Sequence, residues 1–538
     1  MDRRSFLKVG TSAALLPAVQ TFRPAPARSA DQKVLRLAMT VGDIPLTTGQ
    51  PSQGAEGIRF IGHAVYDALF SWDLSQRDKA AKLIPGLAEA YSVDPETKTI
   101  WTFKLRKTNF HDGSPFNADA VVWNLDKLLK RDAPQFDQSQ VAMSGSYLEG
   151  IKSYRKIDDN TVAITTQQPD AMFYYRIAYI NMSSPSRWKE VGGDWNKFAE
   201  RPSGTGPWML ERLVPRERAE LVRNPNYWNT QRIPKLDRLV LLAMPDATTR
   251  VAALLSGQVD WVEAPPPDAV PRLKRQGMQI VSNVYPHIWP YWLSFTPDSP
   301  FRDIRVRKAA NLAIDREGLC QFLGGLAKPA RGQVDVSSPW FGKPTFEVKY
   351  DPATAKKLLA EAGYGPGKRC KIKVLTSQAG SGQMQPLPMN EFVQENMKEV
   401  GFDFEIEVVD WEALRARRRA RADGVENKGI YCLNNSWSIM DPDFGFMSVI
   451  HSKSAPPNGN NWSLYNDPKA DELCNKAKLE FDIEKQNQAI AELHQYVVDQ
   501  AMWVWVVHDL NPRALAPKVK GFVPPQAWFA DLTSIDIA

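Results

Sequence analysis

Helical and β-type patterns of apolar residues alternate along most of the chain. Residues 34–39 alternate apolar and polar positions as an opening strand does, and residues 60–70 have helical spacing. From about residue 246 onward, helical segments are regularly followed by β-rich runs. The expected helices are 248–256, 271–275, 353–362 and 391–400, and the expected strands are 259–262, 278–281, 370–375 and 402–409. This alternation predicts an α/β fold whose sheets are covered by helices.

The region between 76 and 202 carries three short strand signals. They are 100–106, 151–156 and 161–166, and the last two flank Asp158-Asp159-Asn160, which predicts a hairpin. The first strand leads into His111-Asp112-Gly113, a polar turn followed by a helix that Asn117 or Asp119 caps. Because no second histidine or cysteine stands at ligand spacing from His111, we assign it to the turn and not to a catalytic or metal site.

The first thirty residues predict an export signal. Arg3-Arg4 precede Phe6-Leu7-Lys8 and a modest apolar stretch, which resembles a twin-arginine signal with cleavage near Ala25-Pro26-Ala27 or Ala30. Its removal takes away five basic residues and one acidic residue, so the net charge falls from +6 to +2. The net positive charge, which was the main reason to consider a nucleic-acid partner, is therefore largely absent from the mature protein.

Length and composition bound the fold. A chain of 538 residues is too long for one ordinary core, so two or three domains are expected. Hydrophobic residues make up 43% and charged residues 24%, as in globular proteins. Because no apolar run reaches the roughly 18 to 20 residues that span a bilayer, we expect a soluble mature protein.

Motifs for catalysis, nucleotides and metals are missing from the sequence. It contains no Gly-x-Ser-x-Gly or His-Glu-x-x-His, and Gly365 to Arg369 lacks the residues of a P-loop. The cysteines Cys320, Cys370, Cys432 and Cys474 lie 42 to 62 residues apart, so we expect buried free thiols. We predict no catalytic residue, no metal ligand and no cofactor.

Several sequence segments together resemble one protein family. The pattern from Trp101 to Val121, W-x-F-x-L-R-x-x-x-F-H-D-G-x-P-x-x-A-x-x-V, resembles the hallmark of the large periplasmic solute-binding proteins of ABC importers, the peptide/nickel/opine-binding family. Further family-like segments follow in the expected order and cover nearly all of the mature chain: 204–208, 223–228, 255–260, 301–317, 350–364 and 441–443.

The resemblance implies an α/β protein of two lobes, hinged like a clamshell around the ligand, with an additional accessory domain. Lobe I then comprises residues 31–75, 203–288 and 510–538, the accessory domain 76–202, and lobe II 289–509. It also implies a monomeric periplasmic protein without enzymatic activity. Such a protein captures a small organic solute and delivers it to a membrane permease, whose ATPase is a separate chain.

The resemblance also bears on the solute. Peptide-binding members hold the ligand's amine with an aspartate three residues before the acidic-residue–Pro pair; here the pair is Asp441-Pro442, and Ser438 stands at that position. Dipeptide-binding members place an arginine shortly before the helix expected at 391–400, whereas residues 376–390 contain no Arg or Lys. We therefore expect a solute held by aromatic stacking and neutral hydrogen bonds. The expected contacts are Trp289, Tyr291, Asn435, Trp437 and Ser438, with Arg59 for an acidic group and Asp441 or Asp443 for an amine.

Two other functions stay open. An exported hydrolase would use His111 and Asp112. Capture of a metal or metallophore is suggested by the nickel-binding relatives, although His451, the nearest histidine after Asp441, has no neighbouring Cys, His or Met pair. The identity of the solute does not follow from the sequence.

Overall fold

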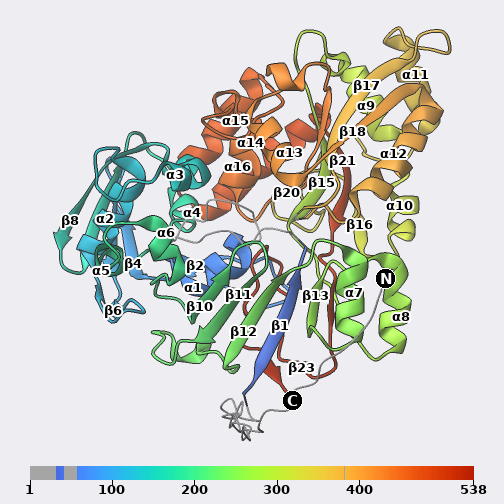
Figure 1. The fold of residues 1–538 in the computed structure, drawn as a ribbon. Helices are drawn as coiled ribbons and strands as arrows, with labels where there is room; N and C mark the ends of the chain where they lie inside the picture. Colours follow the sequence, from blue (N-terminus) through green and yellow to red (C-terminus); the bar gives the residue numbers. More distant parts are fainter. Residues whose placement is uncertain (1–31, 41–56, 381) are drawn as a thin grey trace, which may run out of the picture. The chain divides into compact units, whose positions relative to one another are not determined.

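Three larger β-sheets carry the architecture of the part of the chain that the computed structural model describes, which is residues 32–40, 57–380 and 382–538 (Figure 1). In spatial order, the first sheet contains β10 (Trp208–Val214), β11 (Arg218–Arg223), β12 (Arg238–Ala243), β1 (Val34–Met39), β13 (Trp261–Glu263), β22 (Arg513–Leu515) and β14 (Gln279–Val281). Strand β1 is parallel to both of its neighbours, β12 and β13. Leu37 and Ala38 belong to different apolar clusters, because successive side chains of a strand point to opposite faces.

The second sheet contains β16 (Ala327–Pro329), β21 (Trp503–Asp509), β15 (His287–Leu293), β19 (Cys432–Asn434), β17 (Cys370–Ser377) and β18 (Phe402–Val409), and the short β20 (Trp437–Ser438) pairs with β15. Every residue of β15 and of β21 is buried. Both strands are nearly continuous apolar runs, as expected for strands that are covered on both faces.

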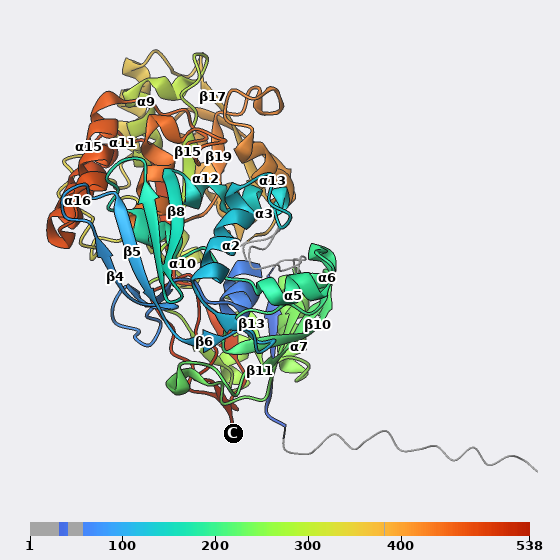
Figure 2. The same ribbon diagram turned by 90° about the vertical axis from the view of Figure 1, so that its left-hand side faces the viewer.

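The third sheet lies in the region 76–202. It contains β4 (Ala88–Val93), β5 (Ile100–Leu105), β9 (Thr161–Thr166) and β8 (Ile151–Asp158), all antiparallel. Figure 2 shows β4, β5 and β8 of this sheet, in which β9 lies between β5 and β8, and α2 contacts β8 and β9. Smaller pairs are β2 (Phe70–Trp72) with β3 (Leu83–Pro85), β6 (Thr108–Asn109) with β7 (Pro115–Phe116), and β23 (Val519–Lys520) with β24 (Asp536–Ile537).

Helices cover these sheets, and aspartates commonly begin them. Asp246, Asp351 and Asp467 each accept a hydrogen bond from a backbone N–H in the first turn of the helix that follows. The described α-helices are α1 (His63–Val65), α2 (Ala118–Leu129), α3 (Gln138–Ser144), α4 (Phe173–Ile177), α5 (Pro185–Glu190), α6 (Trp195–Glu200), α7 (Ala247–Leu255), α8 (Val270–Arg275), α9 (Ile304–Leu312), α10 (Arg316–Phe322), α11 (Pro352–Glu361), α12 (Pro386–Val400), α13 (Trp411–Arg419), α14 (Ser448–Ile450), α15 (Pro468–Leu479) and α16 (Ile483–Asp499).

The chain crosses between the two large sheets at neighbouring places. Residues 282–286 join β14 of the first sheet to β15 of the second, and residues 510–512 join β21 of the second to β22 of the first. The two crossovers are hydrogen-bonded to each other, because Asn283 N donates to Leu510 O at 3.0 Å. Asp509 and Asn511 therefore lie where the sheets are joined.

The α/β alternation predicted from residue 246 onward is confirmed. Strand β18 has the predicted bounds, and α7, α8 and α11 begin one residue before the predicted positions. The helix expected from the spacing of 60–70 is present only as far as Val65, in the π-helical segment Gly57–Gly62 and α1, and Tyr66 takes an extended conformation with φ −123°. The four cysteines are buried and unpaired, as predicted. Among the described residues, no helix is both long and apolar enough to cross a bilayer.

The polar turn around His111 is structural, as predicted. His111 Nε2 lies 2.9 Å from Gly206 O, and Gly204 N donates to His111 Nδ1 at 3.3 Å. Asn117 is the residue that caps α2. A Cβ atom on Gly204 would lie 2.2 Å from Val65 O, so glycine allows this close approach. Through these hydrogen bonds the turn connects the third sheet to the segment around Gly204 and Gly206, which leads into the first sheet.

Candidate functional site

A cavity of about 220 Å³ lies where the two large sheets and both crossovers meet. On this scale one water needs about 10–15 Å³, so a small organic molecule has room here. The lining residues come from the first sheet and its helices (Thr40, Arg59, 245–247, Arg250, 263–265, Pro267), from the crossovers (Tyr285, Asp509, Asn511, Pro512), and from the second sheet's side (Leu323, Leu326, 378–380, Gly382, 384–386).

An ionic cluster forms the crossover side of this cavity. Glu263, the last residue of β13, is 1% exposed and accepts hydrogen bonds from Arg513 Nε at 2.8 Å and Trp261 Nε1 at 2.7 Å. The Arg59 guanidinium lies 2.8 Å from its other carboxylate oxygen. Burial favours the neutral acid, but the Arg513 and Arg59 charges outweigh it and hold the pKa of Glu263 below its ordinary value.

Asp509, at the end of β21, has a different environment. It is 5% exposed, and the backbone N–H of Asn511 donates to its Oδ1 at 2.6 Å. Burial raises the pKa of Asp509 to about 7, against the Asn511 hydrogen bond and the more distant Arg59 and Arg513 charges, which lower it. The protein therefore lowers the pKa of the Glu263 carboxyl group and raises that of its neighbour Asp509.

Arg250 also lines the cavity. Its guanidinium donates to four backbone oxygens, Glu263 O at 3.1 Å, Met244 O at 2.7 Å, Pro245 O at 2.8 Å and Ala264 O at 3.2 Å. The loop 378–385 between β17 and α12 adds amide side chains and no cation. Gly382 in this loop has φ +69°, and a Cβ atom there would lie 2.0 Å from His287 Nδ1.

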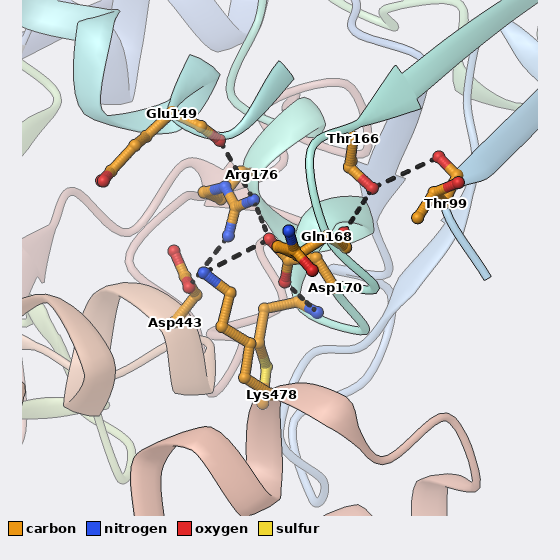
Figure 3. A network of polar contacts seen from close by, with 9 residues as sticks. Thr99, Glu149, Thr166, Gln168, Asp170, Arg176, Asp443 and Lys478 are labelled. Carbon is orange, nitrogen blue, oxygen red and sulfur yellow. Dashed lines mark hydrogen bonds and ion pairs between the residues drawn. The ribbon is translucent and has the colours of Figure 1, made fainter. Parts of the chain in front are cut away.

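A second polar network joins the region 76–202 to the segment after β20 (Figure 3). Arg176, in α4, pairs with Asp170 at 2.5 Å and with Asp443 at 3.1 Å. Figure 3 also shows Lys478 reaching Asp170, at 3.5 Å. Next to this network, Tyr179 OH donates to Asp441 Oδ2 at 2.7 Å, so one short stretch of chain contacts both carboxylates of the 441–443 turn.

Aromatic rings pack around the same turn. The ring of Trp437 stacks on Phe444 with centroids 4.3 Å apart, and Tyr147 stacks on Tyr179 at 4.7 Å. The Arg418 guanidinium lies 5.0 Å from the Trp437 centroid. Burial raises the pKa of Asp441 to about 6, although hydrogen bonds from Phe444 N and Tyr179 OH favour its charged form.

The structure disperses the residues predicted to hold the solute. Arg59 lines the cavity, whereas Trp289 and Tyr291 are 0% and 1% exposed and pack in the core of the second sheet. Tyr291 OH donates to Asn390 Oδ1 at 2.7 Å, so its polar end is occupied as well. The sequence alternation predicted that both rings face the ligand from one side of the strand. In the structure both faces of this strand are covered.

Four of the other predicted contacts, Asn435, Trp437, Ser438 and Asp441, lie on the segment 435–441, which is hydrogen-bonded to the loop 378–385. Ser436 N donates to Gln383 Oε1 at 2.7 Å, which packs this segment against the loop that lines the cavity. Asn435 and Ser438 are buried, and Asn435 Oδ1 has no hydrogen-bond partner within the described ranges. Asp441 is committed to Tyr179 and Phe444.

Sequence reasoning missed Glu263, Asp509, Asn511 and Arg250. Glu263 and Asp509 each end a buried, largely apolar strand, and a charged residue at that position is the signal that could have pointed to them. That Glu263 and Asp509 lie close together could not be predicted, because most of the second sheet's sequence separates them. In the described part of the chain, no group of three or more His, Cys, Asp or Glu residues could hold a metal.

Comparisons with known proteins all match this chain to solute-binding proteins. The family model "Bacterial extracellular solute-binding proteins, family 5 Middle" matches residues 82–478. Heme-binding protein A of Haemophilus influenzae is 28% identical over 478 residues, 85% of this chain and 84% of that protein. A glutathione-binding protein of Salmonella choleraesuis is 27% identical over 521 residues, 92% of this chain and 96% of that protein.

The fold is shared with solved structures. A dipeptide-binding protein from Pseudoalteromonas sp. SM9913, solved in complex with Met-Leu, superposes with a TM-score of 0.80 at 21% identity. The match covers 94% of this chain and all of that chain, 100%. This likeness confirms the predicted α/β fold with two lobes.

Proposed function

The chain belongs to family 5 of the bacterial extracellular solute-binding proteins of ABC importers, and from this premise we propose that it captures its solute in the cavity between the two large sheets. The observation that carries the proposal is the position of the cavity, which both sheets and both crossovers line. A solute in it contacts both of the parts that the backbone joins through residues 282–286 and 510–512. Small-molecule sites commonly lie at such domain interfaces.

We assign the lobes accordingly. Lobe I comprises 31–75, 203–288 and 510–538, the accessory domain 76–202, and lobe II 289–509. The sheet membership of β14, β15, β21 and β22 supports this division, although β15 begins at His287, two residues before the proposed boundary. The crossovers then act as the hinge, and closure follows from contacts that exist only when both lobes touch the solute.

The proposal also covers location, partners and chemistry. The protein is exported by the twin-arginine pathway to the periplasm, where it acts as a monomer and delivers its solute to a membrane permease. The ATPase of that permease is a separate chain. We propose that it catalyses no reaction, since its family consists of substrate-binding proteins.

The solute is a small organic molecule. The named relatives bind heme, glutathione and dipeptides, which are chemically dissimilar, so the solute of this chain is inferred from its own cavity. Arg59 is the sequence-predicted residue that we retain as a direct contact. Asn435, Trp437, Ser438 and Asp441 lie on the segment around Ser436, whose backbone N–H donates to Gln383 of the loop 378–385.

Mass spectrometry of the small molecule that co-purifies with the exported protein tests this function. We expect a defined organic compound at close to one molecule per chain, released on unfolding and rebinding reversibly in calorimetry. Turnover of that compound by the purified protein, lost in His111→Ala, would instead favour the hydrolase. Affinity that disappears on metal chelation and returns with metal would favour metal or metallophore capture.

A further inference from the structure

Arg418, near the end of α13, is a half-buried cation without an acidic partner. Among the residues that the structure describes, its guanidinium makes no hydrogen bond and no ion pair. Its contacts are aromatic, since the guanidinium carbon lies 5.0 Å from the ring centroid of Trp437 and 6.0 Å from that of Trp292. Rings stabilise the positive charge but accept only weak hydrogen bonds, so the N–H donors of Arg418 remain unmatched.

Neighbouring arginines of α13 do have carboxylate partners. Arg415 donates to Glu412 Oε1 at 3.2 Å, and Arg417 Nη1 lies 3.0 Å from Glu407 Oε1. These two acids are therefore occupied. Burial lowers the pKa of Arg418 to about 9, and positive charges on the same helix lower it further. The guanidinium is still charged at neutral pH, and an anion beside it would offset both effects.

The ring beneath the guanidinium is fixed. Trp437 is 3% exposed, its ring stacks on Phe444 with centroids 4.3 Å apart, and its Nε1 donates to Phe444 O at 3.1 Å. A guanidinium that packs over a fixed ring has little freedom left to lose on binding. Its planar fork of N–H groups matches the two oxygens of a carboxylate, a geometry that a lysine ammonium does not provide.

The helix that carries Arg418 adjoins the cavity. Gly380, which lines the cavity, packs on Trp411 at the start of α13, and a Cβ atom on Gly380 would lie 2.3 Å from Trp411 Cε3. Trp411 and Arg418 lie on one side of α13, two helical turns or about 10 Å apart along its axis. Arg418 itself does not line the cavity. A group bound to it therefore belongs to a solute that extends beyond the cavity or to a separate molecule.

We infer that Arg418 binds a carboxylate, which its guanidinium holds by two parallel N–H···O hydrogen bonds while it lies over Trp437. Two sources can supply the carboxylate: an acidic arm of the solute, in which case the inference rests on the proposed function, or a separate organic acid. The acidic group that the sequence assigned to Arg59 is placed here instead, because Glu263 already pairs with Arg59 at 2.8 Å. The amine of a dipeptide still finds no partner, because both acids of the 441–443 turn hydrogen-bond elsewhere.

Nuclear magnetic resonance of the purified mature protein, with isotope-labelled arginine and freed of co-purified solute, tests the inference. The Nε–H signal of Arg418 is assigned by its loss in Arg418→Gln. The probes are glutarate and its neutral analogue glutaramide, at constant ionic strength. We expect a saturable shift of the Arg418 signal with glutarate and none with glutaramide. In calorimetric titration Arg418→Gln should weaken glutarate binding at least about tenfold, and Arg418→Lys, which keeps the charge but not the fork, should weaken it as well.

Arg421→Gln is the matched control. Arg421 lies just beyond α13 and pairs with Asp423 at 2.5 Å on the surface. Its replacement removes the same charge from the same part of the chain but no unmatched donor, so the affinity for glutarate should stay within about twofold.

The co-purified compound identifies the source of the carboxylate. An affinity about tenfold lower in Arg418→Gln assigns the carboxylate to the solute, whereas an unchanged affinity beside retained glutarate binding assigns it to a separate acid. The inference is overturned if glutarate leaves the Arg418 signal unshifted and the co-purified compound binds Arg418→Gln as tightly as the wild type. It is also overturned if Arg421→Gln weakens glutarate binding as much as Arg418→Gln does. Solute binding survives either result, whereas the absence of any co-purified or reversibly bound compound would overturn the proposed function.

Discussion

Arg176 donates a hydrogen bond to Asp443 at 3.1 Å across 267 residues of sequence. Arg176 lies in the region 76–202, which the chain enters from β2 and leaves toward β10 of the first sheet, whereas Asp443 follows β20 of the second. The contact therefore joins parts on opposite sides of the crossovers. Burial raises the pKa of Asp443, while the Arg176 charge opposes that shift.

Arg176→Met should destabilise the protein and loosen this contact. Removal of the guanidinium leaves Asp170 and Asp443 without their principal cation in a buried place, which costs about 3–5 kcal/mol of unfolding free energy. Urea denaturation measures the loss, and small-angle X-ray scattering should show a larger radius of gyration. The control Lys478→Met removes a half-exposed partner of Asp170 and should cost at most about 1 kcal/mol. Equal effects of the two variants would contradict the assignment.

His111→Ala should lower stability without changing solute affinity. The substitution leaves Gly204 N and Gly206 O without their imidazole partner, a cost of about 1–3 kcal/mol in the free energy of unfolding. Urea unfolding measures this cost, and calorimetry with the co-purified compound measures the affinity. A large loss of affinity at unchanged stability would show that His111 contacts the solute.

The turn at His111 and the cavity show what the sequence could and could not reveal. His111, Asp112 and Gly113 are close in sequence, so local turn chemistry predicted their role. The burial of Trp289 and Tyr291 in the core of the second sheet was not foreseen, because alternation gives a strand's two faces but not whether either face is open. Asp509 and Glu263 come together through two crossovers between sheets, and no local pattern contains that information.

Acid should destabilise the protein through its buried histidines. Burial lowers the pKa of His494 and of His508 to about 4 and that of His287 to about 3, from an ordinary 6.5. Between about pH 6.5 and 4 the unfolded chain binds protons that the folded chain does not, so this part of the stability is present above pH 6.5 and is lost as pH falls. Each histidine contributes about 1.4 kcal/mol per pH unit in that window.

Urea unfolding from pH 7 to 4.5 measures this slope, and His494→Gln should make it shallower. The raised pKa values of Asp441 and Asp509, about 6 and 7, act in the opposite direction. These two acids make folding less favourable as pH rises from about 4 to 7. Stability that increases steadily on acidification would show that the two carboxyl groups outweigh the histidines.

Export should require the arginine pair near the start of the sequence, which lies outside the described residues. Arg3→Lys combined with Arg4→Lys keeps the charge but removes both guanidiniums, so a full-length precursor should accumulate in the cytoplasm. Fractionation and immunoblotting measure the distribution, with Lys8→Arg as a control that leaves the pair intact. Unchanged periplasmic yield of the double variant would indicate a Sec signal.

Ordinary dipeptides should not bind. Met-Leu, present in the solved structure of the Pseudoalteromonas relative, brings an ammonium and a carboxylate that both need partners. Asp441 is committed to Tyr179 OH and Phe444 N, and Asp443 to Arg176, so neither acid of this turn is available to an amine. The loop 378–385 has no cation for the carboxylate. An unpaired buried charge costs several kcal/mol, enough to remove micromolar affinity.

Calorimetric titration with Met-Leu and its neutral derivative, N-acetyl-Met-Leu-amide, checks this prediction with the side chains held constant. We expect no saturable binding of the zwitterion. Micromolar affinity for Met-Leu would mean that Asp441 exchanges Tyr179 for the ligand's amine, and Tyr179→Phe, which frees that carboxylate, should then tighten binding. If the same affinity were lost in Asp509→Asn and kept in Asp441→Asn, the amine would lie at the crossover, and Asp509 would bind a cation.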